Sequence, residues 1–306
     1  MRLIAGDVGG TKTLLEFIDD GVVRASQRYE SGRFKTLDLL LTEFITTCPD
    51  RADAACFAVA GPVFEGKAEV TNLHWVMEQS SLESGFQIRR ISLINDFFAI
   101  ALGVPLLKSS DLVSLQLGER QPRAPIAIVG AGTGLGEAMV VFEKDVWNVI
   151  PSEGGHADFA PQDERQAKLF VSLHEQYGHV SWERLLSGAG LVNIFTFLTG
   201  RTETAAAISA LADNGDADAL EAFSVFVDIY GAEAGNMALR LLSRGGVFLA
   251  GGVAAKNIGR FTDGRFMEAF LRKGRFQEML RAMPVDLIVD ERVGLIGAAE
   301  MARRIA

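Results

Sequence analysis

The sequence predicts an α/β fold of two lobes, and three observations support this prediction. Short apolar strands, such as residues 3–8 and 54–60, end in small or acidic residues, as in open α/β sheets that bind ligands at the carboxyl ends of their strands. A strand, a glycine-rich turn and a second strand occur twice, at residues 3–18 and 126–142. The chain has 306 residues, of which 48% are hydrophobic, whereas single cores stop growing near ~250 residues. We therefore expect two lobes, and duplication of one ancestral lobe is a suggestion that the weak similarity of the halves leaves open.

Composition limits the expected partners and compartment. The chain carries 30 Lys and Arg against 39 Asp and Glu, without a long run of either sign, and this net charge of −9 argues against a nucleic-acid surface. Its two cysteines, Cys48 and Cys56, are too few for a disulfide framework or a four-ligand zinc site. The N-terminal segment resembles neither a signal peptide nor an anchor, and no apolar run approaches ~18 residues. We expect a cytoplasmic protein without nucleic-acid or membrane partners.

The hydrophobic pattern predicts the individual elements. Asp19-Asp20-Gly21 indicates a hairpin turn, and the apolar spacing at residues 37–47 indicates an amphipathic helix. A loop is expected at residues 105–125, and a mostly helical stretch at 162–244. Further strands are predicted at residues 13–18, 22–29, 91–94, 126–129, 137–142, 247–250 and 285–289, and further helices at 97–103 and 294–304.

The two glycine-rich turns suit phosphate groups. Where side chains are absent, backbone N–H groups can approach a ligand closely. Residues 130–136 do not fit the dinucleotide fingerprint, because glycine is missing from its sixth position. Residues 6–13 are not a Walker A loop, because one residue separates the last glycine from Lys12 and a strand follows. Taken alone, this first turn fits an ordinary hairpin as well as a phosphate loop.

Six segments, in order along the chain, resemble known proteins. The two phosphate loops and the adenosine loop of the sugar kinase/actin/Hsp70 superfamily are similar to residues 6–11 (GDVGGT), 130–136 (GAGTGLG) and 250–253 (AGGV). Three further segments resemble the bacterial glucokinase family in particular, namely residues 93–97 (LINDF), 152–161 (SEGGHADFAP) and 180–188 (VSWERLLSG).

The resemblance implies a fold and an activity. The fold is an α/β, two-lobed actin-like (ribonuclease H-like) ATPase fold, with duplicated mixed-sheet domains and a cleft between them. The small lobe is expected to comprise residues 1–106 plus 295–306, and the large lobe residues 107–294. The implied reaction is ATP-dependent phosphorylation of D-glucose at its 6-hydroxyl, which gives glucose 6-phosphate and ADP as the first step of glycolysis. ATP, Mg²⁺ and glucose are the expected ligands, and a homodimer is the expected assembly.

Asp96 is the expected catalytic residue. It follows the strand at 91–94 and Asn95, where a carboxylate can take the proton of the sugar hydroxyl that attacks the γ-phosphoryl group. The position also suits the N-cap of the helix at 97–103, and capping by Asn95 or Asp96 is compatible with catalysis. The resemblance makes Asp96 the general base.

Glu153, His156 and Glu183 are the expected sugar ligands. The glycines between Glu153 and His156 allow a tight turn that directs both side chains to one ligand, and their oxygen and nitrogen atoms suit sugar hydroxyls. Apart from the resemblance, His156 fits a structural or metal-binding histidine, and Glu183 fits a solvated helix charge. The resemblance adds Gly61, Asn72, Asn95 and Asp96 to the sugar site, although an Asx-turn explains Asn72 equally well.

The nucleotide is expected to contact both glycine-rich turns. By the resemblance, Asp7 holds Mg²⁺ through water, and the hydroxyls of Thr11 and Thr133 face phosphate. Lys12 either touches phosphate or points to solvent, and it is left outside the expected site. The expected nucleotide-binding residues are Gly6, Asp7, Val8, Gly9, Gly10, Thr11, Gly132, Thr133, Gly134, Gly251 and Gly252.

Three other classes of protein share part of this pattern. A related hexose or N-acetylhexosamine kinase has the same loops, but the cysteine-rich zinc motif of many neighbouring repressor/kinase proteins is absent, since no Cys follows position 56. A sugar-responsive repressor needs a helix-turn-helix before the loop that begins at Gly6. A chaperone-like or filament-forming ATPase gives no role to Glu153, His156 and Glu183. The range of sugars and the phosphoryl donor remain open.

Overall fold

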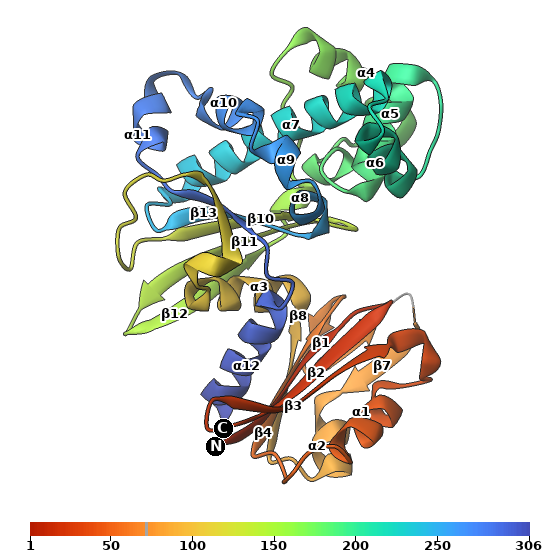
Figure 1. Ribbon diagram of the computed structural model, residues 1–306, viewed down its shortest axis with the longest axis vertical. Coiled ribbons are helices and arrows are strands. Elements are labelled where there is room, and N and C mark those ends of the chain that lie inside the picture. The colour runs from red at the N-terminus through yellow and green to blue at the C-terminus, as the bar shows by residue number, and fades with distance from the viewer. Residues whose placement is uncertain (71–72) are drawn as a thin grey trace. The chain divides into compact units, whose positions relative to one another are not determined.

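The computed structural model describes residues 1–70 and 73–306, and these divide into two compact units (Figure 1). The first unit comprises Met1–Lys108 and Asp290–Ala306, and the second comprises Ser109–Val289. Each unit contains its own mixed β-sheet with helices packed on it. The α/β fold class predicted from the sequence is therefore confirmed.

The first unit is built on a sheet whose described strands follow the order β3-β2-β1-β4-β8. Its strands are β1 (Arg2–Val8), β2 (Lys12–Asp19), β3 (Val22–Glu30), β4 (Ala54–Val59) and β8 (Arg90–Asn95). Its helices are α1 (Leu37–Ile45), α2 (Gln79–Phe86), α3 (Asp96–Gly103) and α12 (Val293–Ile305), and a small separate sheet contains β5 (Val63–Phe64), β6 (Lys67–Val70) and β7 (Trp75–Glu78). β1 and β2 form an antiparallel hairpin, whereas β4 runs parallel to β1 and β8 parallel to β4. Parallel strands therefore bring their carboxyl ends to one edge of the sheet.

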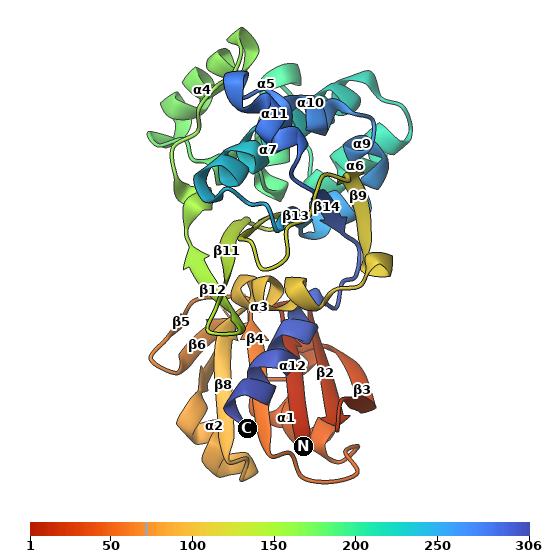
Figure 2. The same ribbon diagram turned by 90° about the vertical axis from the view of Figure 1, so that its left-hand side faces the viewer.

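Both faces of this sheet are buried, which explains the uninterrupted apolar strands of the sequence. Ile4 and Val8 of β1 pack with α1 on one face, whereas Leu3 and Ala5 pack with α3 and α12 on the other. Figure 2 shows α12 lying across its face of the sheet. The predicted amphipathic helix is α1, whose apolar positions are buried and whose first turn is capped by the hydroxyl of Thr36.

The boundary between the units differs from the predicted one near residue 294. The segment that leads into α12 is tied to the first sheet, because Lys12 pairs with Glu291 and Glu16 pairs with Arg292. Residues 290–294 therefore belong to the first unit.

The second unit is built on a sheet whose described strands follow the order β12-β11-β10-β13-β14-β9. Its strands are β9 (Leu112–Gln116), β10 (Ile126–Ala131), β11 (Leu135–Glu143), β12 (Val146–Ser152), β13 (Gly246–Ala250) and β14 (Val285–Ile288). Its helices are α4 (Glu164–Tyr177), α5 (Gly188–Thr199), α6 (Ala205–Asp213), α7 (Ala217–Leu241), α8 (Gly252–Lys256), α9 (Ile258–Phe261), α10 (Arg265–Leu271) and α11 (Gln277–Arg281). β10 pairs antiparallel with β11 and parallel with β13. Buried side chains of α7 form the main core of this unit together with Ala127 and Val129 of β10. The hairpin and parallel neighbour of the first sheet thus recur.

Two strands of this sheet differ from the sequence prediction. β9 lies inside the segment 105–125, so the loop predicted there is wrong at these residues, and β9 is an edge strand held by distant β14. β12 continues the hairpin after Lys144 and Asp145, whose φ values of 53° and 61° suit a two-residue turn. Among the described helices, none has the length and apolar character needed to cross a bilayer.

Candidate active site

The turn between β1 and β2 is held by a serine that follows β3. Ser31 Oγ donates a hydrogen bond to the carbonyl of Gly9 at 2.7 Å and lies 2.9 Å from Thr13 Oγ1. Its backbone N–H donates to the carbonyl of Thr11 at 3.1 Å. The conformation of the predicted residues 6–11 therefore depends on Ser31. The sequence analysis missed this residue, because its contacts arise only when β2 pairs with β3.

Two carboxyl groups lie at the carboxyl edge of the first sheet. Asp7 is near the end of β1, and Asp96 follows β8 as the first residue of α3. Burial, with a further contribution from the charge of Asp96, raises the pKa of Asp7 to about 6, while Lys12 acts in the opposite direction. Burial also raises the pKa of Asp96 above its ordinary value. The two predicted acids therefore interact with each other in a partly desolvated environment.

The predicted sugar residues Gly61, Asn95 and Asp96 lie together in the first unit. Asn95 Oδ1 accepts hydrogen bonds from the N–H groups of Phe97 and Phe98 at 2.9 and 3.2 Å, so Asn95 is the N-cap of α3. Its Nδ2 donates to the carbonyl of Gly61 at 3.2 Å. The capping role considered for this pair is present, and it fixes the start of α3 beside Asp96. The predicted ligand Asn72 lies outside the described residues.

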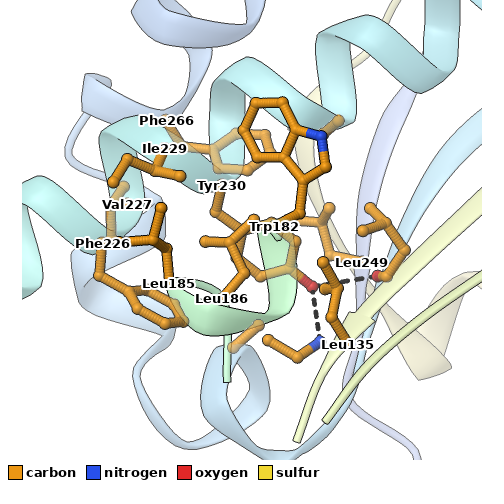
Figure 3. Close-up of a cluster of buried hydrophobic side chains, with 14 of the residues drawn as sticks. Leu135, Trp182, Leu185, Leu186, Phe226, Val227, Ile229, Tyr230, Leu249 and Phe266 are labelled. Carbon is orange, nitrogen blue, oxygen red and sulfur yellow. Dashed lines mark hydrogen bonds between the residues drawn. The ribbon is translucent and has the colours of Figure 1, made fainter. Parts of the chain in front are cut away.

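The second glycine-rich turn and the predicted adenosine loop meet at the ends of β10 and β13. Gly251 has φ +89°, and a Cβ on it would lie 2.3 Å from the carbonyl oxygen of Ala131, so the position requires glycine. Tyr230 of α7, which is fully buried, accepts a hydrogen bond from the N–H of Ala131 at 3.1 Å and donates one to the carbonyl of Val129 at 3.0 Å. Figure 3 shows this hydroxyl with its hydrogen bonds as dashed lines.

Tyr230 is a second supporting residue that the sequence analysis missed. The apolar spacing of α7 predicts that Tyr230 lies in the core, and its ring is indeed buried there. Its hydroxyl has a second role, because it accepts a hydrogen bond from the buried N–H of Ala131, where β10 ends and the glycine-rich turn begins. No local sequence signal reports a bond between residues 99 positions apart.

The three predicted sugar ligands Glu153, His156 and Glu183 converge in the second unit. Glu183 Oε1 lies 4.0 Å from His156 Nδ1, and Glu153 Oε2 lies 3.9 Å from His156 Nε2. Glu183 Oε2 also accepts a hydrogen bond from the N–H of Leu135 at 2.9 Å. The alternative view of Glu183 as a solvated helix charge is therefore wrong.

Glycines allow this close approach of the sugar ligands to the second turn. A Cβ on Gly134 would lie 2.4 Å from Glu183 Oε2, and a Cβ on Gly155 would lie 2.2 Å from the carbonyl oxygen of Leu135. The short helix η4 (Gly154–His156) therefore packs directly on the start of β11. Glu183, in η5 (Trp182–Arg184), links the predicted sugar ligands to the predicted phosphate loop.

A magnesium ion would fit the carboxyl groups of the first unit. Within residues 1–70 and 73–306, no group of three or more His, Cys, Asp and Glu side chains could hold a metal ion. Mg²⁺ bound to a nucleotide needs only one or two protein carboxylates, because phosphates and water complete its shell. Asp7 would supply such an oxygen ligand, and a cation there would relieve its repulsion from Asp96.

The repeated hairpin, its parallel neighbour and the glycine turns define a sugar kinase of the actin-like class. A family model described as Glucokinase matches residues 4–305. The chain belongs to the glucokinase family, as the sequence predicted, and the activity of this family is ATP-dependent phosphorylation of D-glucose.

Individual relatives agree with this assignment. Glucokinase from Nostoc sp. is 39% identical over 341 aligned positions, which cover 99% of each chain. The crystal structure of a glucokinase from an Antarctic psychrotroph matches 99% of both chains, with 30% identity and a TM-score of 0.91. Glucokinase from Balamuthia mandrillaris, solved in complex with glucose, matches 99% of this chain and 93% of its own with a TM-score of 0.82; its 21% identity supports the fold.

Proposed function

We propose that this chain transfers the γ-phosphoryl group of Mg-ATP to the 6-hydroxyl of D-glucose through the residues described above. The observation that most favours this proposal is the link made by Glu183. Its carboxylate lies beside His156 and accepts the N–H of Leu135 in the second glycine-rich turn. A sugar held by Glu183 would be held next to the loop proposed to bind the nucleotide phosphates.

The sugar would be bound by acceptors and a donor directed to neighbouring hydroxyls. Glu153, His156 and Glu183 retain side-chain exposures of 91%, 60% and 32%, so their polar atoms are available to a ligand. Carboxylates accept hydrogen bonds from hydroxyls, and the imidazole accepts or donates according to its tautomer. Gly61, Asn72 and Asn95 are further proposed sugar ligands.

The nucleotide would be bound mainly by backbone. Gly132, Thr133 and Gly134 form one turn, closed by a hydrogen bond of 2.8 Å from the Gly132 N–H to the Gly134 carbonyl. Gly251 and Gly252 lie at the start of α8, and residues 6–11 comprise the end of β1 and the turn of the first hairpin. Backbone N–H groups in such turns favour anionic phosphates.

Asp96 would act as the general base. Burial raises its pKa, which makes its carboxylate a stronger proton acceptor than an exposed aspartate. It would take the proton of the 6-hydroxyl as that oxygen bonds to the γ-phosphorus and the bond to ADP breaks. Asp7 would hold Mg²⁺, which neutralises phosphate charge when bound. A homodimer is proposed from the family resemblance, and a cytoplasmic location from the composition of the chain.

A coupled kinase assay tests this function and its alternative, a related hexose or N-acetylhexosamine kinase. Glucose, mannose, fructose and N-acetylglucosamine are compared with ATP as the donor, and glucose is repeated with polyphosphate. We expect glucose with ATP to give a kcat/KM roughly tenfold or more above every other pair, because each mismatched hydroxyl leaves a polar group unpaired. Comparable rates on all four sugars would overturn the assignment of glucose.

A further inference from the structure

Two glutamates are buried side by side behind the proposed sugar site. Glu137 lies in β11, directly after the second glycine-rich turn, and is 2% exposed; Glu233 lies in α7 and is fully buried. The charges of the two carboxyl groups oppose each other, which favours a proton on one of them. The proposed reaction uses neither residue.

The surrounding groups decide where the proton lies. Glu233 Oε1 accepts a hydrogen bond from Arg240 Nη1 at 2.6 Å, and its Oε2 accepts one from Asn236 Nδ2 at 2.8 Å. Glu137 Oε1, in contrast, has no hydrogen-bond donor among the described residues. These two donors stabilise the charged form of Glu233, so Glu137 is the member of the pair that favours the protonated form.

The titration of this pair is set by groups on several elements. Burial and the charge of Glu233 raise the pKa of Glu137 to about 8, while Arg240 opposes this shift. Lys273, in the segment after α10, faces Glu233, and burial lowers the pKa of Lys273. Tyr230, on α7, also interacts with Glu137, and burial raises the pKa of the Tyr230 hydroxyl. On the β12 side the neighbours Ser152 and Gly154 are uncharged.

The other oxygen of Glu137 touches the turn that carries two sugar ligands. A Cβ on Gly154 would lie 2.0 Å from Glu137 Oε2, so this oxygen occupies the space that a side chain would take. Ser152, opposite Glu137 in the ladder, accepts the N–H of Gly154 on its Oγ at 2.9 Å. Gly154 lies between Glu153 and His156, so a displacement of the Glu137 carboxyl towards Gly154 would press on this turn.

We propose that Glu137 is a positioning residue for the sugar site, whose protonated carboxyl, hydrogen-bonded to Glu233, supports the turn Gly154–His156. Loss of the proton leaves two facing carboxylates, which separate by repulsion and push Glu137 against Gly154. Glucose binding then weakens, whereas the proton transfer at Asp96 and the nucleotide loops are not altered. This inference rests on the proposed sugar-binding role of Glu153 and His156.

The test is the glucose KM of the full-length enzyme between about pH 7 and pH 9 at saturating Mg-ATP. In the unaltered protein, KM should rise roughly fivefold or more with a much smaller change in kcat, the size expected for one lost hydrogen bond. In Glu137→Gln the rise should disappear, because an amide donates to Glu233 as the protonated acid does and cannot ionise.

A matched control distinguishes this pair from buried glutamates in general. Glu16 is a buried glutamate in the second strand of the first hairpin, paired with Ala5, as Glu137 is in the second hairpin, paired with Val129. Glu16→Gln should keep the alkaline rise in glucose KM. A flat profile in the unaltered protein, or the same rise in Glu137→Gln, would overturn the inference. Absence of glucose phosphorylation at every pH would instead contradict the proposed function.

Thermal unfolding against pH supplies a readout that does not need the sugar site. The folded-state pKa of Glu137 lies above the unfolded value of 4.5, so its stabilising contribution is complete below that value and is lost as pH rises towards about 8. The unfolding midpoint should fall over this range, and Glu137→Gln should fall less steeply than Glu16→Gln. Equal slopes in the two variants would contradict the protonated pair.

Discussion

The β1–β2 and β10–β11 hairpins share one architecture and present different chemistry at their strand ends. In each, the first strand lies between its antiparallel partner and a parallel neighbour, β4 or β13. In the first unit this edge carries the carboxyl groups of Asp7 and Asp96. In the second, β10 ends at Ala131 and β13 leads into Gly251, so the edge consists of backbone. One topology therefore places carboxyl groups at the strand ends of one unit and closely packed backbone at those of the other.

The buried glutamates of the two hairpins show a second difference. Glu16 receives Arg292 Nη2 on its two oxygens, at 2.9 and 3.3 Å, whereas Glu137 faces the carboxylate of Glu233. A cation balances the buried charge of Glu16, whereas we propose that a retained proton does so for Glu137. Burial in the second strand of a hairpin thus does not by itself determine the charge state of a carboxyl group, because its partners differ.

Replacing the base should produce the largest effect. We expect Asp96→Asn to lower kcat roughly 100- to 10,000-fold, because the amide cannot accept the proton of the 6-hydroxyl. Its isosteric side chain should leave glucose binding measurable by calorimetry. Asp38→Asn is the control, since Asp38 also lies in the first turn of a helix but is exposed. Near-normal turnover in Asp96→Asn would show that the acidic edge of the first unit is not the catalytic one.

The backbone edge of the second unit can be tested at Gly251. Its φ of +89° and ψ of 157° are a glycine conformation, and forcing alanine into it costs about 1–3 kcal/mol even before the contact with Ala131. We expect Gly251→Ala to raise the KM for ATP roughly tenfold or more, with a smaller change in the KM for glucose. Gly259→Ala is the control, because a Cβ at Gly259 meets nothing within 4 Å. An unchanged KM for ATP would separate this loop from nucleotide binding.

The two supporting hydroxyls provide a smaller test of the same comparison. Tyr230→Phe removes the acceptor of the buried Ala131 N–H and should lower the free energy of unfolding by about 1–3 kcal/mol. Ser31→Ala removes a donor to the Gly9 carbonyl and should cost about 0.5–1.5 kcal/mol. Urea unfolding measures both values. A larger loss for Ser31→Ala would mean that the first turn, rather than the second, depends more on its hydroxyl.

Local pattern predicted the parts of the fold whose cause is local. Continuous apolar runs such as β4 and the 3.6-residue spacing of α1 follow directly from burial, and both were found where predicted. β9 was missed because its partner β14 lies more than 160 residues later, and a short edge strand has little pattern of its own. Six family-like segments predicted the site, and the structure brings Glu153, His156 and Glu183 together.

The supporting residues could not be predicted in the same way. Ser31, Tyr230 and the Glu137–Glu233 pair act through bonds to distant backbone or side chains. Glu137 did leave one signal, an acid inside an otherwise apolar strand directly after a glycine turn. That signal identifies a buried charge, but its partner on α7 is defined only by the packing of α7 on the sheet.

The smallest expected effect concerns Lys12, which the sequence left between phosphate contact and solvent. In the structure its Nζ lies 2.8 Å from Glu291 Oε2, and both side chains are exposed. Exposed ion pairs contribute about 0–1 kcal/mol, so Lys12→Met should change the free energy of unfolding and the KM for ATP very little. Lys67→Met is the control, since Lys67 forms a similar exposed pair with Glu78. A tenfold rise in the KM for ATP in Lys12→Met alone would place a cation among the phosphate ligands of the first turn. The first hairpin would then supply both a carboxylate and a cation, and the description of the first unit as having a purely acidic edge would be wrong.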